Sequence, residues 1–169
     1  MMKTLYLIGG PMGVGKTTVC QQIKRGLPNS VFLDGDWCWD ADPFQVTEET
    51  KDMVMDNICH VLNNFLNCSA YENIIFCWVM HEQKIIDSIL EKLDLKTNAC
   101  IVHCISLVAN EKNLRQRLSR DIESGIRTAD VMERSIARIP LYQNLNTFQI
   151  DTTQKTVTMI VNEIKNLRP

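Results

Sequence analysis

Apolar runs alternate with helical patterns along the whole chain. Short apolar runs rich in branched and aromatic side chains predict strands near residues 4–8, 30–33, 73–79, 99–107 and 147–150. Helical patterns predict helices near residues 15–26, 48–67, 82–93, 110–124, 130–141 and 154–167. In the longest of these helices apolar residues recur at three- and four-residue spacings, at Val54, Ile58, Val61, Leu62, Phe65 and Leu66. This period predicts one buried face on that helix.

Turn residues separate these segments within a single α/β unit. Pro28 and Asn29 end the first helix, and Gly125 is well placed to end the helix that begins near residue 110. The central strands are nearly all apolar, as expected of parallel strands covered on both faces. The alternation predicts an α/β domain of three layers with right-handed crossovers. A chain of 169 residues, 45% of them hydrophobic and without a repeat or linker, is expected to form one domain, residues 1–169.

The most specific motif follows the first predicted strand directly and reads G-x-x-x-x-G-K-T. Its glycines allow backbone N–H groups to point at phosphate oxygens, and the following helix directs the positive end of its dipole there. Lys16 is expected to contact the β- and γ-phosphates, and the Thr17 hydroxyl to contact Mg²⁺. The motif predicts a nucleoside triphosphate site. Its candidate residues are Gly10, Pro11, Met12, Gly13, Val14, Gly15, Lys16, Thr17 and Thr18.

Two carboxylates follow the second predicted strand, in the run Leu33-Asp34-Gly35-Asp36. Ligands of such sheets bind beyond the carboxyl ends of the strands, so Asp34 and Asp36 are expected beside the phosphate loop. Asp34 is a candidate to hold Mg²⁺ through water, because Mg²⁺ keeps much of its hydration shell. Asp36 is a candidate to orient an acceptor hydroxyl and take its proton. The alternative is a simple turn capped by Asp36. No Asp or Glu lies in residues 74–80, where a second carboxylate is common.

Six arginines fall within residues 115–138, whereas Arg25 is the only arginine before them. Arginines on a mobile helical flap would close over a triphosphate and neutralise charge during phosphoryl transfer. Arg120 and Arg127 are the leading catalytic candidates, followed by Arg117. The alternative is a solvated helix pair in which these arginines form ion pairs with Asp121, Glu123 and Glu133.

Residues 34–56 show the opposite charge, with eight carboxylates and one cation, Lys51. A phosphorylated acceptor normally requires fixed cations, most often arginine. The same half of the chain supplies aromatic side chains that are able to cover an apolar or planar group, namely Trp37, Trp39, Phe44 and Trp78. The sequence therefore favours a neutral or cationic acceptor over an anionic one.

The overall composition limits the partners. The net charge of −2 and the acidic acceptor side argue against nucleic acid as a partner. The chain shows no signal peptide and no apolar stretch of membrane-spanning length, so no membrane partner is expected. The seven cysteines are odd in number and contain no C-x-x-C pair, which favours free thiols in a reducing cytoplasm. We expect a cytoplasmic monomer or homodimer.

These motifs together resemble the P-loop small-molecule kinases, which include nucleoside monophosphate, shikimate and gluconate kinases and chloramphenicol phosphotransferase-like proteins. The resemblance spans residues 10–17, the turn at residues 34–36, the arginine-rich flap and the run at residues 148–153. It implies a five-stranded parallel sheet in the order 2-3-1-4-5 and a helical lid at about residues 115–140. It also implies an adenine site with Arg115 or Arg117 opposite residues 152–154, including Thr152 and Thr153.

The resemblance and the motifs together predict an ATP-dependent, Mg²⁺-requiring kinase that phosphorylates a hydroxyl of a small molecule. Lys16, Asp36, Arg120 and Arg127 are the candidate catalytic residues, and Thr17 and Asp34 are the candidate metal-binding residues. One alternative is a nucleotide kinase whose lid arginines reach an acceptor phosphate. The other is a nucleotide-binding regulator such as a GTP-dependent switch, although the chain has no N-K-x-D motif.

Overall fold

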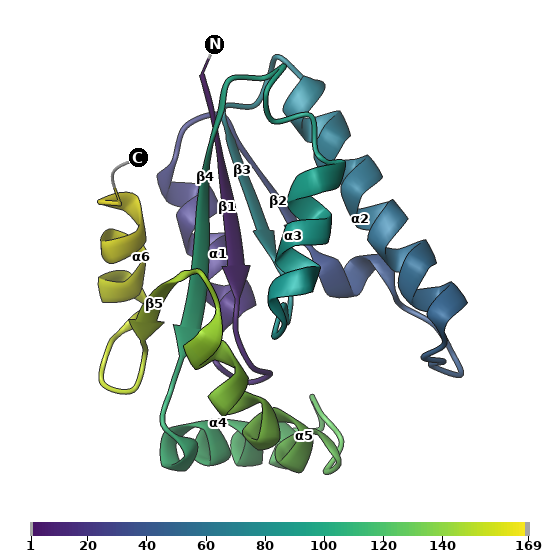
Figure 1. The fold of residues 1–169 in the computed structure, drawn as a ribbon. Helices are drawn as coiled ribbons and strands as arrows, with labels where there is room; N and C mark the ends of the chain where they lie inside the picture. Colours follow the sequence, from purple (N-terminus) through teal and green to yellow (C-terminus); the bar gives the residue numbers. More distant parts are fainter. Residues whose placement is uncertain (1, 168–169) are drawn as a thin grey trace.

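A computed structural model describes residues 2–167 and contains one sheet of five parallel strands (Figure 1). The strands lie in the order β2-β3-β1-β4-β5, which confirms the predicted fold. They are β1 (Lys3–Gly9), β2 (Ser30–Asp34), β3 (Asn73–Cys77), β4 (Cys100–Val108) and β5 (Phe148–Asp151). Since β1 is central, the loop that follows it emerges in the middle of the sheet's carboxyl edge.

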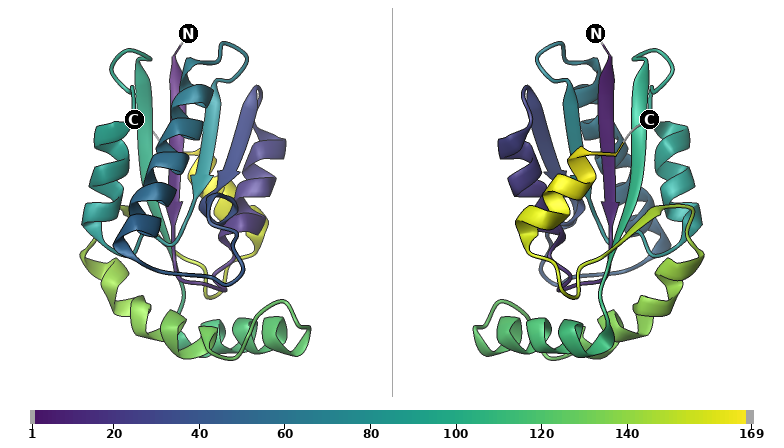
Figure 2. Two further views of the ribbon diagram at one scale, coloured as in Figure 1. Left: turned by 90° about the vertical axis from the view of Figure 1, so that its right-hand side faces the viewer. Right: turned by 90° about the vertical axis from the view of Figure 1, so that its left-hand side faces the viewer.

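Helices cover both faces of the sheet, and a further pair lies across its carboxyl edge (Figure 2). The helices are α1 (Lys16–Gly26), α2 (Glu48–Asn67), α3 (Gln83–Lys92), α4 (Glu111–Glu123), α5 (Val131–Arg138) and α6 (Val157–Lys165). Two 3₁₀ helices, η1 (Gly35–Cys38) and η2 (Ile139–Asn144), follow β2 and α5. We call α4, α5 and the loop between them the lid. No helix within residues 2–167 is long and apolar enough to span a membrane.

Alternate side chains of the central strand enter two separate cores. Tyr6 and Ile8 pack in the cluster that includes α1 and α6, whereas Leu5 and Leu7 pack in the cluster that includes α2 and α3. This division follows from the two-residue period of a strand, and it explains why β1 is apolar on both faces. Because both cores hold β1, the start of the phosphate loop is fixed from both sides.

Two predicted helix boundaries differ from the structure for local reasons. The last helix begins at Val157 and not near residue 154, because the Thr156 hydroxyl accepts a hydrogen bond from Met159 N and caps it. The second lid helix ends at Arg138, and Pro140 then stands in the first turn of η2. The lid therefore returns to the sheet through a short 3₁₀ segment.

Candidate active site

The phosphate loop connects β1 to α1 and leaves the amino end of α1 open. Gly15 is the N-cap residue with φ of +103°, and no side chain caps the helix. The free amide groups of the first turn therefore remain available to an anion. Lys16 Nζ donates to the carbonyl oxygens of Gly10 at 2.8 Å and Pro11 at 3.0 Å. Burial lowers the pKa of Lys16, and the nearby carboxylates of Asp34 and Asp36 act in the opposite direction.

The lid packs directly on this loop. A Cβ added to Gly13 would lie 2.6 Å from Leu118 Cδ2 of α4, so only glycine fits that position without a shift. From α5, the buried Ser135 hydroxyl donates to the Met12 carbonyl at 2.7 Å. The phosphate loop is thus held by both lid helices as well as by β1 and α1.

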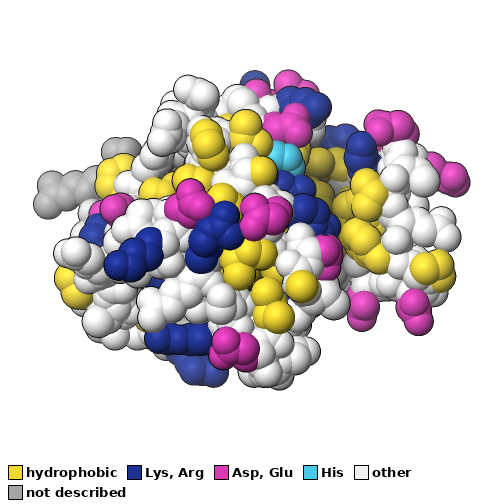
Figure 3. Space-filling view, turned by 90° about the horizontal axis from the view of Figure 1, so that it is seen from below, with side chains coloured by type: hydrophobic (Ala, Val, Ile, Leu, Met, Phe, Trp, Pro, Cys, Tyr) yellow, Lys and Arg dark blue, Asp and Glu magenta, His cyan; other side chains and the backbone are white. Residues whose placement is uncertain are grey.

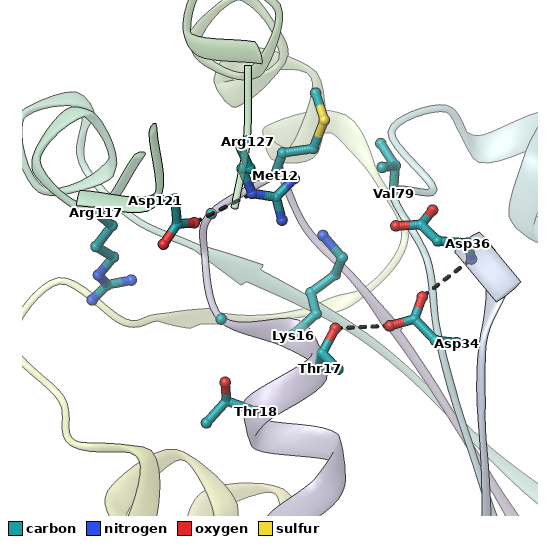
Figure 4. A pocket seen from close by; sticks show the side chains of 12 residues that line it. Met12, Lys16, Thr17, Thr18, Asp34, Asp36, Val79, Arg117, Asp121 and Arg127 are labelled. Atoms are coloured by element: carbon teal, nitrogen blue, oxygen red, sulfur yellow. Dashed lines mark hydrogen bonds and ion pairs between the residues drawn. The ribbon is translucent and has the colours of Figure 1, made fainter. Parts of the chain in front are cut away.

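Thr17 and Asp34 form a polar pair between α1 and the end of β2 (Figure 4). Thr17 Oγ1 donates to Asp34 Oδ2 at 2.8 Å, and the other Asp34 oxygen accepts from Asp36 N at 3.1 Å. Cys77 pairs with Asp34 in register, so β3 supplies a thiol where a second carboxylate would stand. Within residues 2–167 no three His, Cys, Asp or Glu side chains group as a metal site. The Thr17–Asp34 pair fits Mg²⁺, which takes one or two protein oxygens and completes its shell with substrate phosphates and water.

Asp36 lies beside this pair on η1. Burial raises the pKa of Asp36, the Asp34 charge raises it further, and Lys16 and Arg127 oppose the shift. A Cβ on the preceding residue, Gly35, would lie 2.6 Å from Trp78 Cγ, so the turn packs closely on the residue that follows β3. A carboxylate with a raised pKa, held near two cations, suits the acceptance of a proton from a substrate hydroxyl.

A cavity of about 280 Å³ joins these groups to the lid. Arg127, from the loop between α4 and α5, points toward Lys16 and Asp36 in Figure 4 and donates from Nε to Asp121 Oδ2 at 3.2 Å. Residues from the phosphate loop, the ends of β2 and β3 and the lid line the cavity, namely Met12, Gly13, Gly15, Lys16, Thr17, Thr18, Asp34, Asp36, Val79, Arg117, Asp121 and Arg127. Six cationic or acidic side chains from distant segments therefore face one space.

Arg117 connects the phosphate loop to the loop after β5. Its Nη1 donates to Val14 O at 3.1 Å and to Thr152 Oγ1 at 2.9 Å, and its Nη2 donates to Thr152 O at 2.9 Å. Of the two arginines considered for an adenine site, Arg117 is thus the one opposite Thr152. The Thr153 hydroxyl instead accepts from Asn110 N at 3.0 Å, at the start of α4.

Two of the arginines predicted for the site, Arg115 and Arg120, do not line the cavity. Arg115 forms ion pairs with Glu111 at 2.8 Å and Glu133 at 2.9 Å on the outside of the lid. Arg115 therefore follows the alternative of a solvated helix pair joined by ion pairs, and it does not line the cavity. Arg120 is exposed and does not line the cavity either, so its catalytic role stays a prediction that requires a movement of the lid. The helical period explains the difference, because Arg117 and Asp121 share one face of α4 while Arg115 and Arg120 lie on other faces of the helix.

Three residues with a place in this site were not predicted. Asp121 and Val79 line the cavity, and Ser135 binds the phosphate loop from α5. Ser135 follows Val131 by four residues on the buried face of α5. The sequence shows Ser135 as a polar residue on the buried face of this helix, but it contains no indication that the Met12 carbonyl is its partner.

The side of the cleft beyond Asp36 is rich in exposed aromatic and aliphatic groups. The Trp37 side chain is 59% exposed while its ring stands edge-on to Phe32, with centroids 5.3 Å apart. The rings of Trp39 and Phe44 pack against each other with centroids 4.9 Å apart, and the Phe44 side chain is exposed. Figure 3 shows a hollow seen from the lid side, with hydrophobic side chains gathered on one wall and basic side chains near its centre.

The fold and the phosphate loop define a P-loop nucleotide-binding protein. The chain matches the family model described as an AAA domain over residues 7–138, and it belongs to that family. No curated protein is found to match the chain. Among solved structures, a gluconokinase from Sinorhizobium meliloti is 16% identical with a TM-score of 0.67, covering 95% of this chain and 88% of its own.

Two other solved structures have the same fold. A tunicamycin resistance protein from Deinococcus radiodurans is 19% identical with a TM-score of 0.66, covering 96% of this chain and 93% of its own. A sugar kinase from Janibacter sp. is 13% identical with a TM-score of 0.65, covering 97% of this chain and 92% of its own. These similarities confirm the resemblance to P-loop small-molecule kinases at the level of the fold.

Proposed function

We propose that the protein transfers the γ-phosphoryl group of Mg·ATP to a hydroxyl of a small molecule. The observation that carries this proposal is the position of Asp36. It lies beside the Thr17–Asp34 pair and is influenced electrostatically by Lys16 and Arg127. A base, a metal-binding pair and two cations thus meet at the phosphate loop, which is the set of groups that phosphoryl transfer to an alcohol uses.

In the proposed reaction the acceptor oxygen attacks the γ-phosphorus while Asp36 takes the hydroxyl proton. The bond between the γ-phosphorus and the β–γ bridging oxygen breaks, and ADP leaves. Lys16, which now donates to two loop carbonyls, would donate to phosphate oxygens, and Arg127 would neutralise the charge that spreads over the transferring group. Mg²⁺, held by the Thr17–Asp34 pair and the nucleotide, would supply further charge neutralisation.

The acceptor's hydroxyl-bearing part would lie between Asp36 and the exposed aromatic groups near Trp37. Lys51 forms an ion pair with Glu48 at 2.7 Å on the surface of α2, so it is not available to the cleft. This supports the prediction that the wall formed by residues 34–56 faces an uncharged or cationic group. Two of the proteins with the same fold, a gluconokinase and a sugar kinase, favour a polyhydroxylated acceptor.

The nucleotide kinase remains the second candidate, because α5 brings a further arginine, Arg138, toward the residues after β3. A non-catalytic nucleotide-binding regulator would use the phosphate loop alone and would not require Asp36. The raised pKa of Asp36 beside Lys16 favours a catalytic protein over this regulator.

Replacing Asp36 tests the proposal directly. Asp36→Asn is expected to lower kcat at least about 100-fold while ATP affinity changes less than about threefold, because general-base catalysis typically contributes two to four orders of magnitude. ATP affinity is measured by calorimetry and turnover by release of ADP in the presence of acceptor. Asp40→Asn is the matched control, because Asp40 is an exposed residue four positions later and does not line the cavity. Unchanged turnover in Asp36→Asn would remove Asp36 from the reaction.

A further inference from the structure

Asp121 is a carboxylate on the wall of the cavity that would hold the triphosphate. Two other carboxylates of the cavity have a place in the proposed reaction, since Asp34 binds Thr17 and Asp36 would take the acceptor proton. Asp121 lies on the lid side, in the last turn of α4, where the helix dipole disfavours a negative charge. A carboxylate there would also repel phosphate groups. The position of Asp121 therefore requires a specific partner.

The partner of Asp121 is Arg127, from the loop between α4 and α5. Arg127 Nε donates to Asp121 Oδ2 at 3.2 Å, and both side chains line the cavity. Among the residues described, no hydrogen bond or ion pair joins either terminal nitrogen of Arg127, Nη1 or Nη2, to the protein. Figure 4 shows Arg127 pointing toward Lys16 and Asp36. The carboxylate thus holds Nε and leaves both terminal nitrogens available to a ligand in the cavity.

Two other lid arginines use their terminal nitrogens for carboxylates of the protein. Arg115 Nη1 binds Glu133 at 2.9 Å, and Arg134 Nη2 binds Asp130 at 2.7 Å. Neither arginine lines the cavity. A guanidinium group binds phosphate most specifically through two parallel N–H donors. Of these three ion-paired arginines, Arg127 is the one that keeps such donors beside the phosphate loop.

The helix that carries Asp121 is fixed against the phosphate loop. Arg117, one turn earlier on α4, donates to Val14 O at 3.1 Å. Leu118 packs on Gly13 so closely that a Cβ added there would lie 2.6 Å from Leu118 Cδ2. Residues three and four apart on a helix share a face, so these contacts keep Asp121 directed at the same loop. Asp121 is therefore a rigid point from which a neighbouring side chain can be oriented.

The loop that carries Arg127 is exposed and folds back on Asp121. Ile126 N and Arg127 N both donate to the backbone oxygen of Asp121, at 2.8 and 3.2 Å. Ile126 is 72% exposed, and a Cβ added to Gly125 would meet nothing within 4 Å. A long arginine side chain loses much rotational freedom when it is fixed, so its orientation depends on a partner. Backbone hydrogen bonds set the course of the loop, and the Asp121 carboxylate sets the direction of the guanidinium.

We propose that Asp121 is the positioning residue for Arg127, holding Nε so that both terminal nitrogens face the transferring phosphoryl group. The inference rests on the proposed kinase function and adds a residue to its machinery. Asp121 contacts no substrate and takes no proton, and its carboxylate stays on Nε while the cavity is filled. Donors that are oriented before the reaction stabilise the charge of the transition state without reorganisation, and Asp121 provides this orientation.

This role separates the effect on kcat from the effect on the KM for ATP. Loss of the Asp121 carboxylate removes a negative charge beside the triphosphate but leaves Arg127 without a fixed direction. Asp121→Ala is therefore expected to lower kcat about 10- to 100-fold, while the KM for ATP does not rise. Alanine favours the helix and relieves the dipole, so the urea unfolding midpoint should not fall. A purely structural role would lower this midpoint together with kcat.

A double-mutant cycle tests whether Asp121 acts through Arg127. Transfer of labelled γ-phosphate is measured for the wild type, Asp121→Ala, Arg127→Met and the double variant. In the Arg127→Met background, Asp121→Ala is expected to change kcat less than about twofold. Glu123→Ala is the matched control, because Glu123 is an exposed carboxylate at the end of α4 that does not line the cavity. If Asp121→Ala does not fold, Asp121→Asn replaces it in the cycle, with a smaller loss of kcat because an oxygen acceptor remains.

An unchanged kcat in Asp121→Ala, or equal losses of kcat in both Arg127 backgrounds, would overturn the positioning role while leaving the kinase in place. An NMR measurement covers the case in which no acceptor is phosphorylated and the kinase proposal itself fails. The Arg127 Nε–H resonance, identified by its loss in Arg127→Lys, is recorded with Mg²⁺ and a non-hydrolysable ATP analogue. Displacement of this resonance from the position of free arginine in the wild type, and its return in Asp121→Ala, would support the pair. The same position in both proteins would overturn it.

Discussion

Replacing Gly13 with alanine tests how closely the lid fixes the phosphate loop. Gly13 has φ of +81°, and an added Cβ would lie 2.6 Å from Leu118 Cδ2 and 2.8 Å from Leu118 Cγ. The left-handed backbone conformation costs a non-glycine residue about 1–2 kcal/mol. Overpacking against α4 adds about 1–3 kcal/mol. Gly13→Ala is therefore expected to lower the free energy of unfolding by about 2–5 kcal/mol.

Gly125 provides a matched control for the backbone contribution. Its φ is +74°, and an added Cβ would meet nothing within 4 Å, so Gly125→Ala should cost about 1–2 kcal/mol. Urea unfolding followed by tryptophan fluorescence measures both variants. In a Leu118→Ala background the clash is removed, and Gly13→Ala should then cost no more than Gly125→Ala. If Gly13→Ala is no more destabilising than Gly125→Ala in the wild-type background, the proposed contact between lid and loop is refuted.

Three further predictions follow from the site. Thr17→Val should weaken Mg·ATP binding about 10- to 100-fold and leave metal-free ATP binding nearly unchanged, as calorimetry with and without Mg²⁺ would reveal; equal losses in both would exclude a metal role. Arg117→Met should lower the free energy of unfolding by about 1.5–3 kcal/mol, because charged hydrogen bonds to Val14 and Thr152 are lost, and unchanged urea unfolding would contradict this. Asp36→Asn should be more stable than the wild type at neutral pH, because the raised pKa means that ionised Asp36 is disfavoured in the folded state. That difference should shrink as the pH falls toward the unfolded-state pKa, and thermal melts in which it grows on acidification would contradict the assignment.

The sheet and its helices were predictable because their signals are local. The apolar run of β1 and the glycines that follow it determine a strand, a turn and a helix within about twenty residues of sequence. Likewise, Asp34 and Asp36 follow a strand directly, so the topology alone places them at the carboxyl edge near the phosphate loop. The strand order was available from the resemblance, and the structure confirms it.

The lid was predicted as a region but not residue by residue. Which arginine reaches the cavity depends on the rotation of α4 about its axis, and that rotation is set by the packing of Leu118 on Gly13. Arg117 therefore faces Thr152 while Arg115 faces solvent, a difference that their two-residue separation alone does not decide. The partner of Ser135, the Met12 carbonyl, lies far away in sequence, and no local pattern identifies it.

The most direct test of the central claim is transfer of labelled γ-phosphate from Mg·ATP to pooled acceptors, with the wild type and Asp36→Asn compared. The pools would contain nucleosides, nucleoside monophosphates, sugars and polyols, sugar acids, aminoglycosides and aromatic hydroxylated antibiotics. The account predicts a labelled product in at least one pool with the wild type and its loss with Asp36→Asn, while both proteins bind ATP. Tight ATP binding without transfer to any pool, or transfer that persists in Asp36→Asn, would contradict it.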